Sequence, residues 1–273
     1  MLHSMKDFEN CAISATDGQI GHVKNLYFDD QSWVIRYLVV NAGSWLSSRM
    51  VLISPISLEQ PDWQERIFPV SISKEQVKNS PGIDTDKPIS RQNEEQHLGY
   101  FGYPYYWGGT SIWGDGFFPY AMAPYYADYE TDHASHERQV EAYSRNGPNH
   151  LGNDDPHLRN CKTVNGYQIE ARDGKIGSIS DFLVDEKTWA IRYLVIETSH
   201  WWSGHRVLIA PEWITEVHWL DKKVSVNLTL DSVKNAPSYD PKKEWSRQLD
   251  IQLYQHYNRV GYWTDTTAHE ESI

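Results

Sequence analysis

The sequence lacks any long apolar segment. Its longest aliphatic runs have three or four residues, whereas a helix that crosses a bilayer needs about 20 predominantly apolar residues. The start of the chain, Met1 to Asn10, has neither the apolar stretch nor the cationic start of a secretion signal. We therefore expect a soluble, cytoplasmic protein that does not span a membrane.

Cysteine is scarce, and positive charge is in deficit. Cys11 and Cys161 are the two cysteines, and neither has a second thiol nearby in sequence, so we expect free thiols and no disulfide framework. Lys and Arg total 25 against 37 Asp and Glu, which gives a net charge of -12. Because phosphate backbones are bound mainly by clustered cations, this balance argues against direct nucleic-acid binding.

The chain does contain a repeat. The run Ile35 to Val40 (IRYLVV) returns as Ile191 to Ile196 (IRYLVI), and each run follows a tryptophan. At the same offset of 156, with no gap, the further pairs are Asp17-Gly18 with Asp173-Gly174, Val51-Leu52-Ile53 with Val207-Leu208-Ile209, Val77-Lys78-Asn79 with Val233-Lys234-Asn235, Ser90-Arg91-Gln92 with Ser246-Arg247-Gln248, and Tyr106-Trp107 with Tyr262-Trp263. We interpret the chain as a tandem duplication and refer to its first and second copies.

Within the first copy, the local signals are mostly those of short strands. Asp17-Gly18 between two apolar runs predicts a tight hairpin turn, and Gly21 indicates a bulge or a close backbone approach. Val34 to Asn41 is rich in β-branched and aromatic residues, as expected for a strand buried on much of both faces. Arg36 interrupts this strand. We expect its side chain to point outward at a barrel rim or to lie along an aromatic ring, with ligand binding as the alternative.

A short helix is expected near the end of each copy. In the first copy Ser73 can cap this helix, and Gln76 can complete a capping box, while Pro81-Gly82 ends it. Five or six short strands and one helical turn per copy predict a mainly β protein. The expected architecture is two tandem small β-barrels, each with a short C-terminal helix, joined by an aromatic and Gly-rich and then acidic linker.

The order of these motifs resembles the PRC-barrel family. The motifs are the Asp-Gly-x-Ile-Gly opening, the Arg-Tyr-Leu-Val strand, the Val-Leu-Ile-x-Pro strand and the closing Val-Lys-Asn-x-Pro helix, and they cover about residues 8–92 and 164–248. The family is named after the cytoplasmic domain of the H subunit of photosynthetic reaction centres, and it includes the C-terminal domain of a ribosome maturation factor. The resemblance implies two PRC-type barrels that act in docking and assembly, without a catalytic set.

The repeat also predicts the domain boundaries. We expect a first PRC-barrel-like domain at residues 1–98, an aromatic-rich segment and polar linker at 99–160, a second such domain at 161–263, and a disordered tail at 264–273. Residues 100–129 hold about 13 aromatic side chains among Gly and Pro. Two interpretations stay open for this segment: it packs over the barrels as ordered coil, or it is a surface that binds a partner or self-associates.

Two histidines are weak candidates for a metal site. His133 and His136 stand one helical turn apart beside carboxylates, and such a pair can hold a metal. The spacing fixes no third ligand, and a solvated linker helix is the alternative. We therefore expect no metal and no cofactor.

Tryptophans in loops between strands are the stronger candidates for binding. Trp45 in the first copy corresponds to Trp201-Trp202 in the second, and exposed tryptophan is a common contact residue at interfaces. The candidate interaction residues are Trp45, Trp201, Trp202, Arg36 and Arg192. The alternative is that these indoles cover the ends of the barrels.

No catalytic motif is present. The sequence has no Gly-rich phosphate loop, Gly-x-Ser-x-Gly elbow, His-Glu-x-x-His or Cys-x-x-Cys. We therefore expect a protein that is not an enzyme and that docks an unidentified protein partner, with stress response or reaction-centre-like assembly as candidate processes. A ribosome- or RNA-maturation-associated factor, an enzyme without a recognisable motif, and a homodimer are the alternatives left open.

Overall fold

The computed structural model describes residues 1–82, 89–107, 111–114, 119, 156–198 and 205–263. The chain divides into two compact units. The N-terminal unit consists of residues 3–163 and 184–191, and the C-terminal unit consists of residues 1–2, 164–183 and 192–273. Each unit contains one β-sheet with few helices, so the chain is mainly β, as expected.

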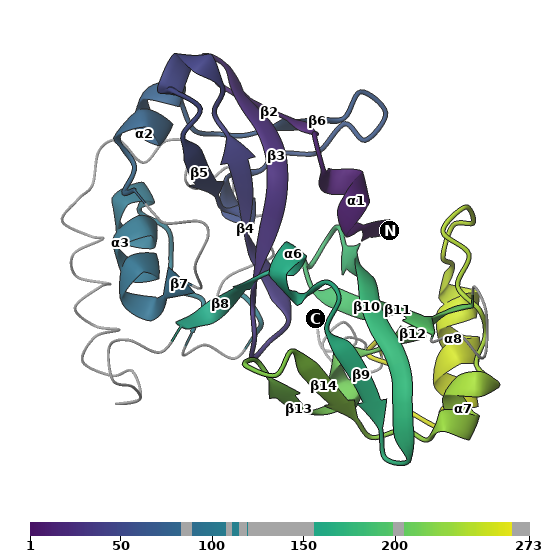
Figure 1. Ribbon diagram of the computed structural model, residues 1–273. Helices are drawn as coiled ribbons and strands as arrows, with labels where there is room; N and C mark the ends of the chain where they lie inside the picture. The colour runs from purple at the N-terminus through teal and green to yellow at the C-terminus, as the bar shows by residue number, and fades with distance from the viewer. Residues whose placement is uncertain (83–88, 108–110, 115–118, 120–155, 199–204, 264–273) are drawn as a thin grey trace, which may run out of the picture. The chain divides into compact units, whose positions relative to one another are not determined.

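The sheet of the N-terminal unit has the strand order β5-β4-β3-β2-β6, and β8 pairs with both β3 and β7 (Figure 1). Its strands are β2 (Ala12–Ala15), β3 (Gly18–Asp29), β4 (Val34–Asn41), β5 (Met50–Ile53), β6 (Ile67–Pro69), β7 (Ile89–Ser90) and β8 (Pro156–Asn160). Its helices are α1 (Met5–Phe8), α2 (Lys74–Asn79) and α3 (Arg91–Phe101), with 3-10 turns η1 (Ser44–Leu46) and η2 (Pro55–Ser57).

The sheet of the C-terminal unit has the order β12-β11-β10-β9-β14-β13. The strands are β9 (Gln168–Ala171), β10 (Gly174–Asp185), β11 (Ile191–Thr198), β12 (Arg206–Ile209), β13 (Ile214–His218) and β14 (Lys223–Val226). The helices are α7 (Leu230–Lys234) and α8 (Arg247–His256), with the 3-10 turn η5 (Pro211–Trp213). Two short elements, β1 (Leu2–Ser4) and α6 (Cys161–Val164), straddle the unit boundaries. The long strands and both helices recur at the offset of 156 seen in the sequence.

The predicted hairpin and its glycines are confirmed. β2 and β3 pair antiparallel across the turn, and Gly18 has the positive φ of 130° that a tight turn favours. A Cβ on Gly21 would lie 1.8 Å from the Asn41 carbonyl oxygen, and one on Gly177 would lie 2.0 Å from that of Glu197. Both glycines therefore permit a close backbone approach, which the sequence indicated for Gly21.

Each hairpin turn also caps a helix. The Asp17 carboxylate accepts a hydrogen bond from Lys74 N at 2.7 Å, and Asp173 accepts one from Leu230 N at 2.8 Å. These amides belong to the first turns of α2 and α7, where backbone donors lack partners within the helix. The same Asp-Gly pair thus makes the turn and ties the following helix to it.

β4 forms the centre of the core of the N-terminal unit. All its residues from Val34 to Val40 are buried, Arg36 included. The strand lies between β3 and β5, and branched or aromatic residues suit a strand that is covered on both faces. Of the two positions expected for Arg36, the outward one at a rim is wrong, because 2% of this residue is exposed. The position along an aromatic ring is confirmed, since the guanidinium lies over the Tyr106 ring.

The helices differ from the expectation in number. The capping box of α2, made by Ser73 and Gln76, is present as predicted. A second and longer helix, α3, follows it in the first copy, and α8 follows α7 in the second. α3 packs on the sheet, since the His97 imidazole donates to the Leu52 carbonyl oxygen of β5 at 3.2 Å. In the part of the chain that the structure describes, no helix is long and apolar enough to cross a membrane.

Candidate functional site

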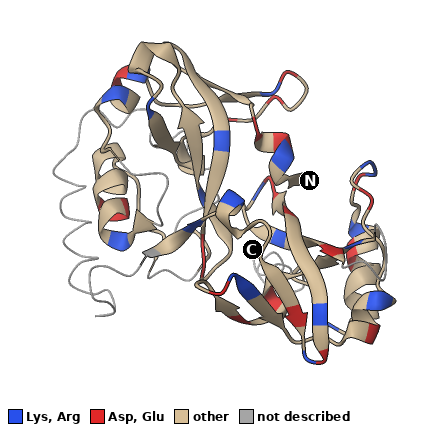
Figure 2. Cartoon of the chain, in the orientation of Figure 1, with Lys and Arg blue, Asp and Glu red and all other residues tan. Residues whose placement is uncertain are grey.

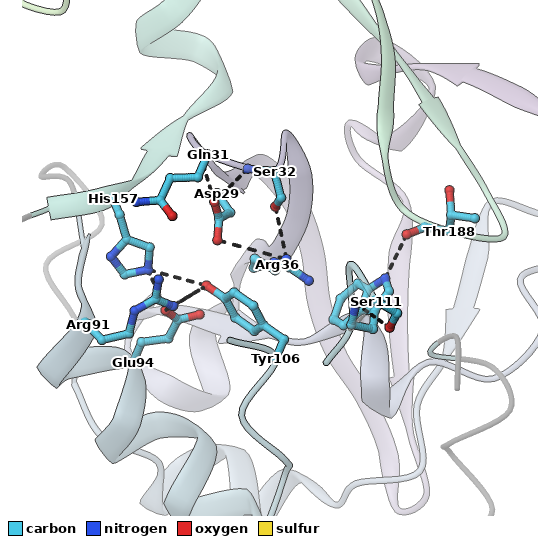
Figure 3. Close-up of polar contacts among 11 residues, drawn as sticks. Asp29, Gln31, Ser32, Arg36, Arg91, Glu94, Tyr106, Ser111, His157 and Thr188 are labelled. Carbon is cyan, nitrogen blue, oxygen red and sulfur yellow. Dashed lines mark hydrogen bonds and ion pairs between the residues drawn. The ribbon is translucent and has the colours of Figure 1, made fainter. Parts of the chain in front are cut away.

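A cluster of buried charged side chains lies between β4 and α3 in the N-terminal unit (Figure 3). On the β4 side, the Arg36 guanidinium lies 3.5 Å from the centroid of the Tyr106 ring and 4.6 Å from that of Trp113. Its Nη2 donates to Ser32 Oγ at 3.1 Å and stands 4.0 Å from the Asp29 carboxylate. Burial lowers the pKa of Arg36 below its usual value, whereas Tyr106 and Asp29 oppose this change. The rings of Tyr106 and Trp113 therefore contact the guanidinium in place of water.

On the α3 side, the Glu94 carboxylate collects three donors on one oxygen. Glu94 Oε2 accepts from the His157 imidazole at 2.7 Å, from the Tyr106 hydroxyl at 2.9 Å and from Arg91 Nη1 at 3.1 Å. Glu94 is completely buried. Burial and the Glu94 charge raise the pKa of Tyr106 well above its usual range. The Tyr106 hydroxyl therefore stays protonated and donates a hydrogen bond to the carboxylate.

The C-terminal unit holds the counterpart of this cluster. Asp250 replaces Glu94 and accepts hydrogen bonds from Tyr193 (2.6 Å), Trp245 (2.7 Å), Tyr262 (3.1 Å) and Arg247 (3.2 Å). Arg192 lies over the Tyr262 ring at 4.2 Å, as Arg36 lies over Tyr106. Burial, and then the Asp250 charge, raise the pKa of Tyr262 to about 12. One arrangement of an arginine, a carboxylate and a tyrosine is thus present in both copies.

The two clusters attach the chain that follows each helix to its sheet. In the N-terminal unit, Tyr103, Tyr106 and Trp113 are buried, and Trp113 Nε1 donates to the Thr188 carbonyl oxygen at 2.8 Å. For these residues the interpretation as ordered coil packed on the core is confirmed. Because the carboxylate and the tyrosine of the N-terminal cluster are buried, their chemistry is that of charge-assisted hydrogen bonding within the protein.

A solvent-accessible cleft lies elsewhere on the N-terminal unit. It has a volume of about 450 Å³ and is lined by Asp17, Trp45, Lys74, Glu75, Lys78 and Asn79. The half-buried Trp45 indole donates to the Ile20 carbonyl oxygen at 2.6 Å, and the Lys74 ammonium lies 4.5 Å from the indole ring. The indole is therefore held in a fixed position with part of its surface open to solvent. We call this feature the Trp45 cleft.

The structure separates the residues that the sequence grouped as interaction candidates. Trp45 lines the cleft, whereas Arg36 is buried in the cluster and Arg192 is part of the C-terminal counterpart. Trp201 and Trp202 lie outside the described residues, as do His133 and His136. Within the described ranges, no group of three or more His, Cys, Asp or Glu side chains is arranged to hold a metal ion.

Sequence reasoning missed the partners of the cluster. Glu94 and Arg91 are in a helix that was not predicted, and His157 is on β8, far along the chain. The recurrence of Ser90-Arg91-Gln92 as Ser246-Arg247-Gln248, followed in both copies by an acid, was the available signal. No family model and no curated protein matches the chain.

Proposed function

We propose that the chain is a non-enzymatic docking protein built from two PRC-barrel-like modules, and that the Trp45 cleft is a contact surface for a protein partner. The corresponding strand orders of the two sheets support two modules of one kind. The resemblance to the PRC-barrel family rests on the sequence motifs of the strands and of the helix after them.

The Trp45 indole is the observation that carries the docking proposal. A tryptophan held by a hydrogen bond and a cation contact loses little conformational freedom on binding, and it offers a large amphipathic surface. Lys78, Glu75 and Asn79 beside it are exposed and supply polar groups of both signs. This composition of an aromatic anchor with a polar rim is typical of protein interfaces.

The burial of the charged cluster supports a role other than catalysis. General acids and bases must reach a substrate proton, but Glu94, His157 and Tyr106 are buried and are bonded to one another. Figure 2 shows basic and acidic residues interspersed along the strands and helices of both units. Such a distribution is unlike the clustered cations of a nucleic-acid surface.

The test is capture of a partner with the full chain and with variants of the cleft. We expect the wild type to retain a discrete protein from an extract of the native host, and Trp45→Ala to lose it because the anchor is removed. Lys78→Glu is expected to weaken retention without changing the fold. Leu220→Ser is the matched control, because Leu220 is a large apolar side chain with 99% exposure outside the cleft.

Equal retention by the wild type and by Trp45→Ala, with unchanged circular dichroism, would contradict the cleft as the contact surface. Loss of the partner in Leu220→Ser as well would indicate non-specific apolar capture. Nucleic acid that stays with the chain at moderate salt, measured by the absorbance ratio at 260 and 280 nm, would favour an RNA-associated factor instead.

A further inference from the structure

The N-terminal unit is not made of the first copy alone. It includes residues 156–163 and 184–191, while Met1–Leu2 of the first copy belongs to the C-terminal unit. At the offset of 156 the second copy starts at residue 157, a few residues before the domain boundary expected at 161, so residues 157–163 and 184–191 belong to the second copy. The start of each copy has the same form: β1 and α1 in the first correspond to β8 and α6 in the second. Leu2 and Lys6 recur as Leu158 and Lys162 at the offset of 156. A segment of the second copy therefore stands within a unit built mainly from the first.

β8 is an integral strand of this unit. It pairs antiparallel with β3, with Tyr27 opposite Asn160 and Asp29 opposite Leu158. Tyr27 also faces Tyr37 of β4, so β8 occupies the other edge of β3, on the side where β2 pairs with the start of that strand. Leu158 is completely buried. Figure 1 shows β8 extending the sheet beside β7.

The side chains of this segment complete polar contacts of the unit. His157 donates to Glu94 at 2.7 Å, and Arg159 Nε donates to the Asp30 carboxylate at 2.7 Å. Asn25 of β3 bonds the Asn160 side chain. Without residues 156–163, Glu94 would lose one of its three donors and the second edge of β3 would end at β2. The first copy is therefore incomplete by itself.

The second segment makes a reciprocal contact. Ile35 N donates to the Trp189 carbonyl oxygen at 2.8 Å, and Ile191 N donates to the Trp33 carbonyl oxygen at 2.8 Å, on either side of a bridge between Val34 and Ala190. Trp189 and Ile191 correspond to Trp33 and Ile35 at the offset of 156. In each copy, the carbonyl oxygen of the tryptophan therefore accepts a hydrogen bond from the backbone amide of the isoleucine in the other copy. This is the isologous pattern of a two-fold symmetric dimer. Trp33 and Trp189 even share a left-handed backbone, with φ of 55° and 59°.

We infer that the two copies pair as the subunits of a strand-exchanged homodimer do. The edge of β3 and residues 33–35 of the first copy are then contact surfaces for a second copy of the same repeat. Association of the two copies then depends on the contacts that residues 156–163 and 184–191 make with the first copy. It does not require that the copies be joined by a continuous chain. A chain cut between the copies stays together as a two-chain complex.

The test starts from the full chain with a protease recognition site inserted between Asn146 and Gly147. After cleavage we expect the two fragments to elute together, at a 1:1 ratio and at the size of the intact chain, at a concentration of about 1 μM. Fragments that elute separately under native conditions would overturn the inference. If the folded chain resists the protease, the site is cut in denaturant and the fragments are refolded together, and the same two outcomes apply.

A charge-reversal pair distinguishes specific strand exchange from non-specific association of the two fragments. Arg159→Glu places two carboxylates together at Asp30, and we expect it to raise the dissociation constant of the fragments at least about tenfold. Combining it with Asp30→Arg should restore most of this loss. Glu216→Lys, on an exposed face of β13, is the control charge change and should have no effect. Unchanged fragment affinity in Arg159→Glu, or equal losses in both charge variants, would contradict the proposed contact.

Discussion

The guanidinium of Arg36 lies 3.5 Å from the centroid of the Tyr106 ring, in the interior of the N-terminal unit. Among the described residues, its Nε and Nη1 atoms have no hydrogen-bond partner. Stacking on Tyr106 and Trp113 therefore takes the place of hydrogen bonds for part of this cation. A planar guanidinium is suited to such a position because it is weakly hydrated and its faces can stack.

Arg36→Lys tests this dependence on shape. The ammonium of lysine is compact and strongly hydrated, so it keeps the charge but loses the stacking and costs more to bury. We expect the free energy of unfolding of the N-terminal unit to fall by about 2 kcal/mol, measured by urea denaturation. The same exchange at the exposed Arg172 of the C-terminal unit should change the free energy of unfolding of that unit by less than about 0.5 kcal/mol. Equal effects at both positions would contradict the stacking argument.

Glu94→Gln tests the acceptor at the centre of the cluster. The amide keeps the shape of the side chain but removes the negative charge of the acceptor to which three groups donate hydrogen bonds. Less negative charge then remains near Arg36 and Arg91 to compensate their positive charges. We expect a loss of about 3 kcal/mol in the free energy of unfolding. Glu95→Gln is the matched control on the exposed face of α3 and should stay within about 0.5 kcal/mol of the wild type. A small effect at Glu94 would mean that the buried charges are not coupled.

His97 predicts a pH dependence that the second copy lacks. Burial lowers the pKa of His97 from 6.5 to about 4, although its bond to the Leu52 carbonyl opposes this. Between these values the unfolded chain binds a proton that the folded chain does not, so stability falls as the pH drops from about 6.5 to 4. The loss from this group is about 3 kcal/mol, and below pH 4 it no longer grows.

His97→Leu removes this dependence, and Leu253 is the natural residue at the equivalent position. At pH 7 we expect the variant to be less stable by about 1 kcal/mol, because the Leu52 carbonyl loses its donor. Near pH 4 the variant should be the more stable protein. Thermal or urea unfolding at both pH values checks this reversal, and an unchanged order would show that His97 is protonated in the folded state.

The sequence was most informative where the structure depends on local backbone geometry. Asp17-Gly18, Gly21 and the capping box at Ser73 each act over a few residues, and their geometry follows from the residue types themselves. The burial of Val34 to Val40 could also be predicted, because a strand covered on both faces is apolar at nearly every position and does not alternate between apolar and polar residues. These features could be predicted, and the structure has them.

α3 was missed because its buried face is polar. Glu94 and His97 turn inward together with Leu98, so the helix lacks the apolar stripe by which an amphipathic helix is recognised. The partners that make this burial favourable, Tyr106 and His157, are distant in sequence. The Trp45 cleft could be predicted in part, since the indole was singled out. The position of Lys74 above it depends on how α2 docks on the hairpin.

Gly21→Ala tests the close approach of β3 to the end of β4. The added Cβ would lie 1.8 Å from the Asn41 carbonyl oxygen, and this atom belongs to a paired strand that cannot move aside freely. We expect a loss of at least about 3 kcal/mol in the free energy of unfolding. Gly177→Ala should behave alike in the C-terminal unit, where the corresponding separation is 2.0 Å from the Glu197 oxygen.

Gly99→Ala is the matched control for this prediction. Gly99 is inside α3, and a Cβ there would meet no atom within 4 Å. Because alanine favours the helix over glycine by about 1 kcal/mol, we expect this variant to be slightly more stable than the wild type. The two substitutions are chemically identical and should have opposite signs in urea denaturation. If Gly21→Ala were tolerated as well as Gly99→Ala, β3 and β4 would not approach closely at this bulge, and the conformation shared by the two copies would have to be reconsidered.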